Sequence, residues 1–253
     1  MNGVAAALAD SSIMLRRNLK HSVRNPLVVF NAVLVPIGIM VVFVKVFGGA
    51  FSVGEDYIDY ATPGMIVMAV SYGLVSTATA VNDDMTKGII NRFKAMDVSR
   101  GAVLTGQVVI TTVRSLVAIA AIVLVALPMG FSPHASVLQW LGVLGLVVLL
   151  TVAASWLAVA LGLAAKTAES AGMAAVPLIM LPFLSSAFVP ADTMGAGLRQ
   201  FAEYQPFTPI IETLRGLLAG HPSGGDAVAA VLWCVALALA GYVWAVSLFK
   251  KRA

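Results

Sequence analysis

The sequence predicts an all-α integral membrane protein, and two observations support this prediction. Of its 253 residues, 60% are hydrophobic and only 11% are charged, with a mean hydropathy of +0.94. Several almost uncharged runs are about 20 residues long, which is the length of helix that crosses the roughly 30 Å hydrocarbon core of a bilayer. Lipid offers no partners to backbone polar groups, so each run is expected to be a helix. Six transmembrane helices are predicted, at about residues 27–49, 60–81, 104–129, 136–165, 168–189 and 226–249.

Basic residues gather in alternate connections between these runs. The N-terminal segment, the connections after the second and fourth runs, and the C-terminus hold 12 of the 16 Lys and Arg residues. Cytoplasmic loops carry the excess of Lys and Arg, so both termini are predicted to lie in the cytoplasm and the chain to be a multi-pass protein of the cytoplasmic membrane. The net charge of +4 therefore indicates membrane anchoring rather than a nucleic-acid partner.

Residues 1–26 have the pattern of an amphipathic interfacial helix. Apolar residues from Val4 to Val23 form one stripe, and Arg17, Lys20 and Arg24 lie opposite it. Such a helix is expected to lie on anionic membrane lipid. The alternative is a basic tail that only sets the topology.

No motif for catalysis is present. The sequence lacks the G-x-x-x-x-G-K-[ST] loop that binds ATP phosphates, and it lacks a cluster of metal ligands. The three histidines lie outside the predicted spans. We therefore expect this chain to be no enzyme and to bind no metal or cofactor itself. Inside the spans, Arg114 is costly to bury and is expected to face protein or water, unless it extends toward the membrane surface.

Two connections have more than a linking role. In residues 82–107, the residues Met85, Ile89, Phe93 and Met96 recur at helical spacing, which predicts a short helix that docks in a partner's groove. The alternative is a solvated loop that only sets topology.

Residues 190–220 contain two short segments, about 195–204 and 209–218, which are too short to cross the bilayer. They predict a re-entrant extracellular helix pair between spans five and six. Gln205 and Pro206 would form its corner, Phe201 would anchor the first helix, and Thr208 would cap a second helix that starts at Pro209. The alternative is a loop that lies on the headgroups.

Several short stretches carry a resemblance to a known family. The pattern D-x-x-x-G-x-x-x-R-F-x-x-M-x-x-S-R runs from Asp84 to Arg100, and the second span opens with the sequence ATPG. A Val-Pro pair at 189–190 is followed by Gln-Pro at 205–206, and then by Leu-Arg-Gly at 214–216 and Gly220. In their order along the chain, the stretches resemble the type-two ABC exporter permeases, especially the daunorubicin-resistance type of actinobacteria. Many members have proline where this chain has Asp97.

The resemblance implies that residues 1–253 form a single transmembrane permease domain. Two copies of a separate ABC ATPase would bind ATP and Mg, and a second identical or related permease chain would complete the transporter. It implies outward transport of a lipophilic drug, antibiotic or lipid by alternating access. The residues expected to contact the ATPase are Asp84, Gly88, Arg92, Phe93 and Arg100. The residues expected along the transport path are Met68, Tyr72, Thr79, Arg114, Met180, Phe183 and Phe188. The residues expected in the re-entrant element are Phe201, Gln205, Pro206, Pro209 and Arg215.

Two other functions stay open at this point. An ion-coupled carrier would show acidic or histidine relays within its spans, and this sequence has none there. A non-transporting membrane anchor or regulatory protein would use residues 82–107 to bind a partner other than an ATPase.

Overall fold

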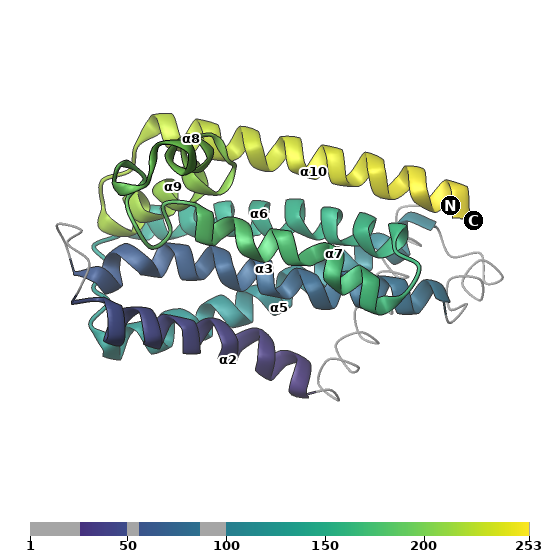
Figure 1. The fold of residues 1–253 in the computed structure, drawn as a ribbon, viewed down its shortest axis with the longest axis horizontal. Coiled ribbons are helices and arrows are strands. Elements are labelled where there is room, and N and C mark those ends of the chain that lie inside the picture. The colour runs from purple at the N-terminus through teal and green to yellow at the C-terminus, as the bar shows by residue number, and fades with distance from the viewer. Residues whose placement is uncertain (1–25, 50–55, 87–99, 253) are drawn as a thin grey trace.

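The computed structural model describes residues 26–49, 56–86 and 100–252, and every regular element in these ranges is a helix. The longer elements are α2 (Pro26–Val42), α3 (Tyr57–Thr86), α5 (Arg100–Ala126), α6 (Val137–Ala164), α7 (Ala168–Met180) and α10 (Gly224–Arg252). Shorter turns extend three of these helices: η1 (Phe43–Phe47), η2 (Leu127–Met129) and η3 (Leu181–Leu184). Between α7 and α10 lie η4 (Ala191–Thr193), α8 (Ala196–Tyr204) and α9 (Phe207–Ala219). The long helices run side by side in alternating directions (Figure 1).

Each of the six apolar runs that the sequence predicts falls on one of these helices, but they differ in length. Among the described residues, four helices are long and apolar enough to cross a membrane, within α3, α5 to η2, α6 and α10. Two described apolar stretches are shorter, Val33–Val46 and Ala168–Leu184. The second is short because Pro177 and Pro182 remove backbone donors, and α7 gives way to the 3₁₀ turn η3 at Leu181.

Helix α3 is the centre of the bundle. It packs against α2, α5, α6, α7 and α9, whereas α10 covers α6 and α9 on the far side (Figure 1). Every residue from Tyr60 to Ser71 is buried. Its second half is buried less completely, because Tyr72, Ser76 and Thr79 lie half-exposed along one side. We call these three residues the α3 polar stripe.

Small residues allow the helix backbones to approach closely. An added Cβ at Gly64 of α3 would lie 2.7 Å from the Cβ of Ala187, in the turn that follows η3. An added Cβ at Gly162 of α6 would lie 2.5 Å from the carbonyl oxygen of Ala78 on α3. Membrane helices have little hydrophobic drive to associate with each other, so such close van der Waals contact stabilises their packing.

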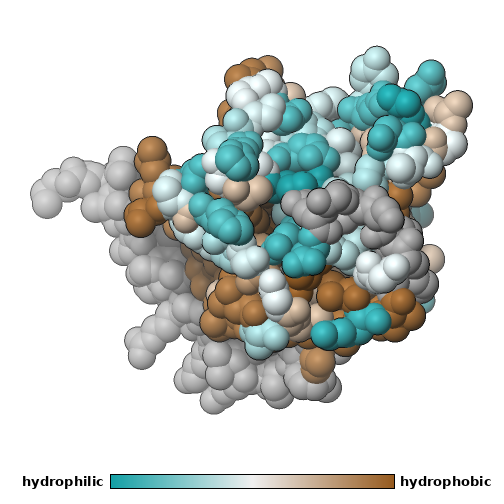
Figure 2. All heavy atoms as spheres, turned by 90° about the vertical axis from the view of Figure 1, so that its left-hand side faces the viewer, coloured by the Kyte–Doolittle hydropathy of each residue, from teal (hydrophilic) through white to brown (hydrophobic). Residues whose placement is uncertain are grey.

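The two ends of the bundle differ. The α9 end carries α8, α9 and the α5–α6 connection, and the opposite end carries the last residues of α3 and α10 (Figure 1). Viewed from the α9 end, hydrophilic side chains cover much of the face, and hydrophobic side chains lie along its borders (Figure 2). The functional site described next is built at this hydrophilic end and along α3.

Replacing Gly64 with alanine is expected to lower the free energy of unfolding by about 1–3 kcal/mol, because the new methyl group overlaps the backbone at Ala187. Thermal unfolding of the purified protein measures the change. Gly145→Ala is the matched control, because nothing lies within 4 Å of an added Cβ at this position in α6. Equal unfolding temperatures for the two variants would contradict this account of the packing.

Candidate functional site

The helices α8 and α9 meet at a fixed corner. Gln205 ends α8 in an extended conformation, and Pro206 then leads directly into α9 at Phe207. The side-chain Nε2 of Gln205 donates to the carbonyl oxygen of Leu184 at 2.6 Å, which ties the corner to the end of η3. Both short helices and the corner at Gln205 and Pro206 lie where the sequence predicts them.

The predicted cap of α9 is wrong. The helix starts at Phe207, and Thr208 makes no capping bond within it. Instead, the hydroxyl of Thr208 accepts a hydrogen bond from the backbone N–H of Ser186 at 3.4 Å. Pro206 has the φ angle needed to begin the helix, and Pro209 falls within the first turn, where a missing N–H leaves no helical hydrogen bond unmade. The hydroxyl of Thr208 therefore binds the turn that follows η3 instead of capping α9.

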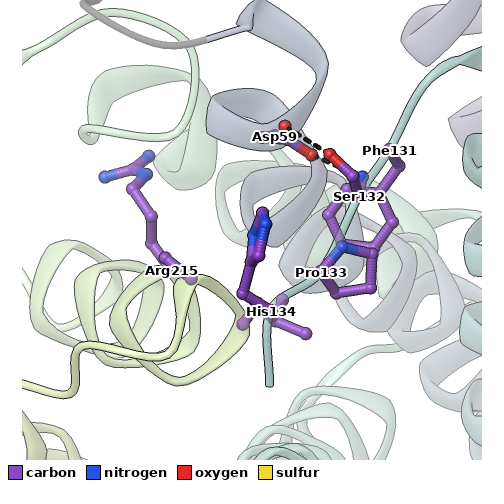
Figure 3. Close-up of a pocket in the computed structure, with 8 residues that line it drawn as sticks. Asp59, Phe131, Ser132, Pro133, His134 and Arg215 are labelled. Carbon is purple, nitrogen blue, oxygen red and sulfur yellow. Dashed lines mark hydrogen bonds between the residues drawn. The ribbon is translucent and has the colours of Figure 1, made fainter.

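The α5–α6 connection is fastened to this end of the bundle. Asp59 of α3 accepts hydrogen bonds from the backbone N–H of Ser132 at 2.9 Å and from its hydroxyl at 3.4 Å. The backbone N–H of His134 donates to the carbonyl oxygen of Leu218 in α9 at 2.9 Å. Figure 3 shows Asp59, His134 and Arg215 around a cavity of about 180 Å³ that the connection helps to enclose.

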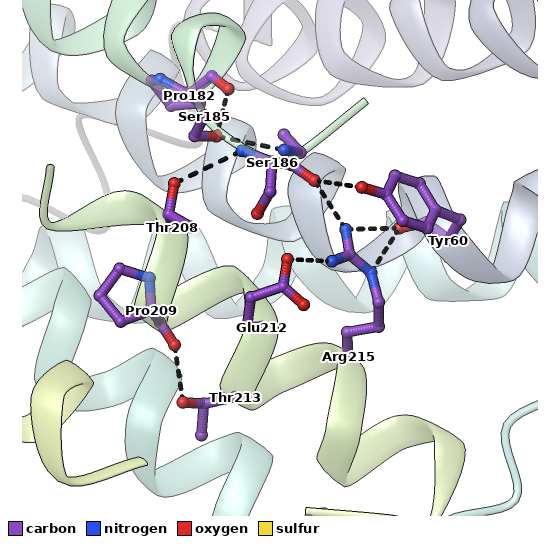
Figure 4. A network of polar contacts seen from close by, with 10 residues as sticks. Tyr60, Pro182, Ser185, Ser186, Thr208, Pro209, Glu212, Thr213 and Arg215 are labelled. Carbon is purple, nitrogen blue, oxygen red and sulfur yellow. Dashed lines mark hydrogen bonds and ion pairs between the residues drawn. The ribbon is translucent and has the colours of Figure 1, made fainter. Parts of the chain in front are cut away.

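Arg215 joins three separate parts of the chain. Its Nε and Nη2 donate to the carbonyl oxygen of Tyr60 at 3.3 and 3.2 Å, and Nη2 also donates to the carbonyl oxygen of Ser186 at 2.8 Å. Nη1 pairs with Glu212 at 2.5 Å. The guanidinium carbon lies 3.8 Å from the centre of the Tyr60 ring, and the Tyr60 hydroxyl donates to Ser186 as well (Figure 4). We call Tyr60, Ser186, Glu212 and Arg215 the α9 junction.

The chemistry of the junction requires arginine. A guanidinium presents five N–H donors in a planar fork, whereas an ammonium is a compact point charge that cannot both fork and stack on a ring. In this site the fork reaches α3 and the turn after η3 at once, and its side chain is only 12% exposed. The junction therefore holds α9 against α3 at the hydrophilic end.

A second arginine lies midway along α5. The Nη2 of Arg114 donates to the carbonyl oxygen of Gly73 and to the hydroxyl of Thr77, both at 3.0 Å, and Thr77 is also bonded to Thr111. The side chain thus faces α3 rather than the membrane surface. A charged residue at the centre of a membrane helix costs about 2.5–3.5 kcal/mol on insertion scales, and hydrogen bonds to these two oxygens offset that cost.

The other residues predicted along the path differ in how far they are buried. The rings of Phe183 and Phe188 pack at a tilt with their centres 5.4 Å apart, and the ring centre of Phe188 also lies 4.6 Å from that of Phe43 in η1. Phe188 and Met68 are buried among helices of this chain, so in this conformation both side chains pack in the core and line no open path. Tyr72 and Thr79 are half-exposed on the α3 polar stripe, and Met180 is exposed. Sequence reasoning missed Phe43, which is one hydrophobic residue among many in the first run.

Comparison with known proteins identifies the family. The family model described as ABC-2 type transporter matches residues 11–219. The chain belongs to the ABC-2 type transporter family. It is 29% identical to the daunorubicin resistance ABC transporter permease protein DrrB1 of Streptomyces coeruleorubidus, over 93% of this chain and 83% of that protein. It is 23% identical to the probable doxorubicin resistance ABC transporter permease protein DrrC of Mycobacterium tuberculosis strains CDC 1551 / Oshkosh and H37Rv, over 92% of this chain and 85% of theirs. The resemblance stated from the sequence is confirmed, and the chain is a membrane permease subunit.

The residues predicted to contact the ATPase are described only in part. Asp84 lies in the last turn of α3, and Arg100 is the first residue of α5. Gly88, Arg92 and Phe93 lie outside the described residues, as does the amphipathic segment 1–25. Among the side chains that the structure places, no group of three His, Cys, Asp or Glu residues could hold a metal ion.

One residue beside this connection was missed by sequence reasoning. The side-chain nitrogen of Asn82 donates to the carbonyl oxygens of Gly162 at 3.0 Å and Ala165 at 2.8 Å. These oxygens lie at the C-terminal end of α6, where a helix has no backbone donors of its own to bind them. A fully buried amide one turn before the end of α3 therefore fastens α3 to α6. The only sequence signal was a polar residue at the edge of an apolar run.

Replacing Arg215 of the permease with lysine is expected to lower the free energy of unfolding by about 2 kcal/mol, because lysine cannot reproduce the forked bonds to two carbonyl groups. Arg199→Lys is the control. Arg199 pairs with Glu203 at 2.7 Å on the exposed side of α8, and the hydrogen bond that it donates to Glu203 raises the pKa of Arg199. Thermal unfolding of both variants checks the prediction. An Arg215→Lys protein as stable as the Arg199→Lys protein would contradict it.

Proposed function

We propose that this permease is the membrane half of an ATP-driven exporter, which moves a lipophilic drug, antibiotic or lipid out across the cytoplasmic membrane by alternating access. The family match over residues 11–219 carries the proposal. The sequence has no loop of the kind that binds ATP phosphates, so a partner subunit would bind and hydrolyse the ATP. The names of the relatives, which are daunorubicin and doxorubicin resistance permeases, support a drug-like substrate.

In this proposal six helices cross the membrane: α2 with η1, α3, α5, α6, α7 with η3, and α10. Lys166, Lys250 and Lys251 lie at the end opposite α9, which supports a cytoplasmic position for that end and for both termini. Acidic residues, such as Asp59 and Asp226, lie at the α9 end. The α9 end would then face outward, with residues 1–253 forming one permease domain.

The helices α8 and α9 would form the re-entrant element. On α8, Leu198, Phe201 and Tyr204 expose apolar or aromatic surface along one side, while Arg199 and Glu203 pair beside them. Such a helix suits the boundary between headgroups and acyl chains. In contrast, α9 packs against α3, α6 and α10, and the α9 junction holds it there. The pair would close the outer end of the path in this conformation.

Two ATPase subunits, carrying ATP and Mg, would bind the connection at residues 82–107 of two permease chains, identical or related. Asp84, Gly88, Arg92, Phe93 and Arg100 would make the contacts. Closure of the ATPases would push on the end of α3, and Asn82 would pass this movement to α6. The path would follow the accessible residues Tyr72, Thr79, Met180 and Phe183 together with Arg114. Met68 and Phe188 would reach it only when the helices part.

Phe93→Asp is expected to abolish association with the ATPase, because the new carboxylate would lie on the apolar docking stripe. Purification of the tagged permease in mild detergent, followed by quantification of the co-purifying ATPase, measures the loss. Lys94→Asp adds the same carboxylate on the opposite side of the expected helix and should retain the ATPase. Retention of a stoichiometric ATPase by Phe93→Asp, or the absence of any nucleotide-binding partner from the native protein, would contradict the proposal.

A further inference from the structure

The three arginines whose side chains the structure places have different partners. Arg199 pairs with Glu203, and Arg215 pairs with Glu212. Arg114 instead contacts two neutral oxygens, on Gly73 and Thr77. Within the described ranges, this permease thus holds a cation midway along a membrane helix that no carboxylate neutralises. An uncompensated charge at this depth is a sign of a binding or transport function.

The guanidinium also has donors to spare. Both of its hydrogen bonds use Nη2, and Nε is buried without a partner among the described residues. A guanidinium has five N–H donors, and its strongest partners are carboxylate and phosphate oxygens, which it can bind in pairs. The missing partner therefore has the chemistry of an oxyanion.

The position of Arg114 gives a ligand access. On α5, Val113 and Val117 beside it are 39% and 57% exposed. On α3, Gly73 and Thr77 lie next to the α3 polar stripe of Tyr72, Ser76 and Thr79, which is half-exposed. Arg114 thus lies where the buried interface of α3 and α5 meets accessible surface that is apolar on one helix and polar on the other. An amphiphile could place its apolar body against the apolar surface of α5 and its anionic group beside Arg114 and the polar surface of α3.

We infer that Arg114 binds the oxyanion, a carboxylate or phosphate, of an amphiphilic ligand, and that this site prefers an anionic amphiphile to a cationic one. The inference rests on the proposed transport function, of which it specifies the substrate class. A ligand amine at this position would meet a like charge in a medium of low dielectric constant, where repulsion is strong. The oxyanion could belong to a free amphiphile or to a lipid headgroup.

The test measures binding of three fluorescent probes to the permease–ATPase complex in phosphatidylcholine nanodiscs, with empty nanodiscs as the blank. The probes are a dansyl-labelled undecanoic acid, its methyl ester and the corresponding primary amine. The acid should bind about tenfold or more tightly than the ester, and the amine should bind most weakly. Arg114→Gln should remove the preference for the acid while leaving the ester unchanged, and Arg114→Lys should retain part of it. Lys45→Gln removes a cation from exposed η1 and should change nothing.

Equal binding of the acid and the ester to the unmodified complex would overturn the inference, even if Arg114→Gln did not assemble. Arg114→Gln lowering the affinity of all three probes equally would also overturn it, because that result indicates a structural role. Phosphatidylglycerol in the nanodiscs should compete with the acid if a lipid headgroup is the natural ligand, and should not compete if a free amphiphile is. If the acid is preferred but never stimulates ATP hydrolysis, the proposed export function fails and the binding site stands.

Discussion

The burial of one helix, α3, inside five others is the constraint on which the rest of the structure depends. Polar side chains tie this helix to its neighbours at three heights. Arg215 reaches α3 from α9, Arg114 reaches it from α5, and Asn82 ties it to α6. All three side chains donate to backbone carbonyl oxygens, so each tie fixes a side chain of one helix against the backbone of another.

In the proposed transport cycle, these ties would determine which helices move together with α3. A push at Thr86 acts on a helix that is 30 residues long and tied to a different partner near each end and in the middle. Helices joined this way move as packed bodies, because close-packed interfaces shift between discrete arrangements rather than deform continuously. The tie in the middle, at Arg114, has no carboxylate beside it among the described residues, whereas the guanidinium of Arg215 also pairs with Glu212.

Hydropathy predicts the helices well and their ends less well. Helix α3 begins at Tyr57 and continues to Thr86, beyond the predicted range of 60–81, because Asp59 and the residues after Val81 are polar but compatible with a helix. The corner at Gln205 and Pro206 follows from local proline chemistry, whereas the error at Thr208 arose because its partner, Ser186, comes from another part of the chain. Arg215 was named through the family resemblance. Its bond to Tyr60 spans 155 positions, which no spacing rule reveals.

The most direct test of the account is the energy source of transport in inverted membrane vesicles that contain the permease and its ATPase. The dansyl-labelled undecanoic acid and daunorubicin serve as probes, so that an anionic and a cationic amphiphile are both covered. The account predicts that at least one accumulates only with hydrolysable ATP, and that a protonophore does not prevent this. Accumulation that persists without ATP and collapses with the proton gradient would contradict the account and would indicate an ion-coupled carrier.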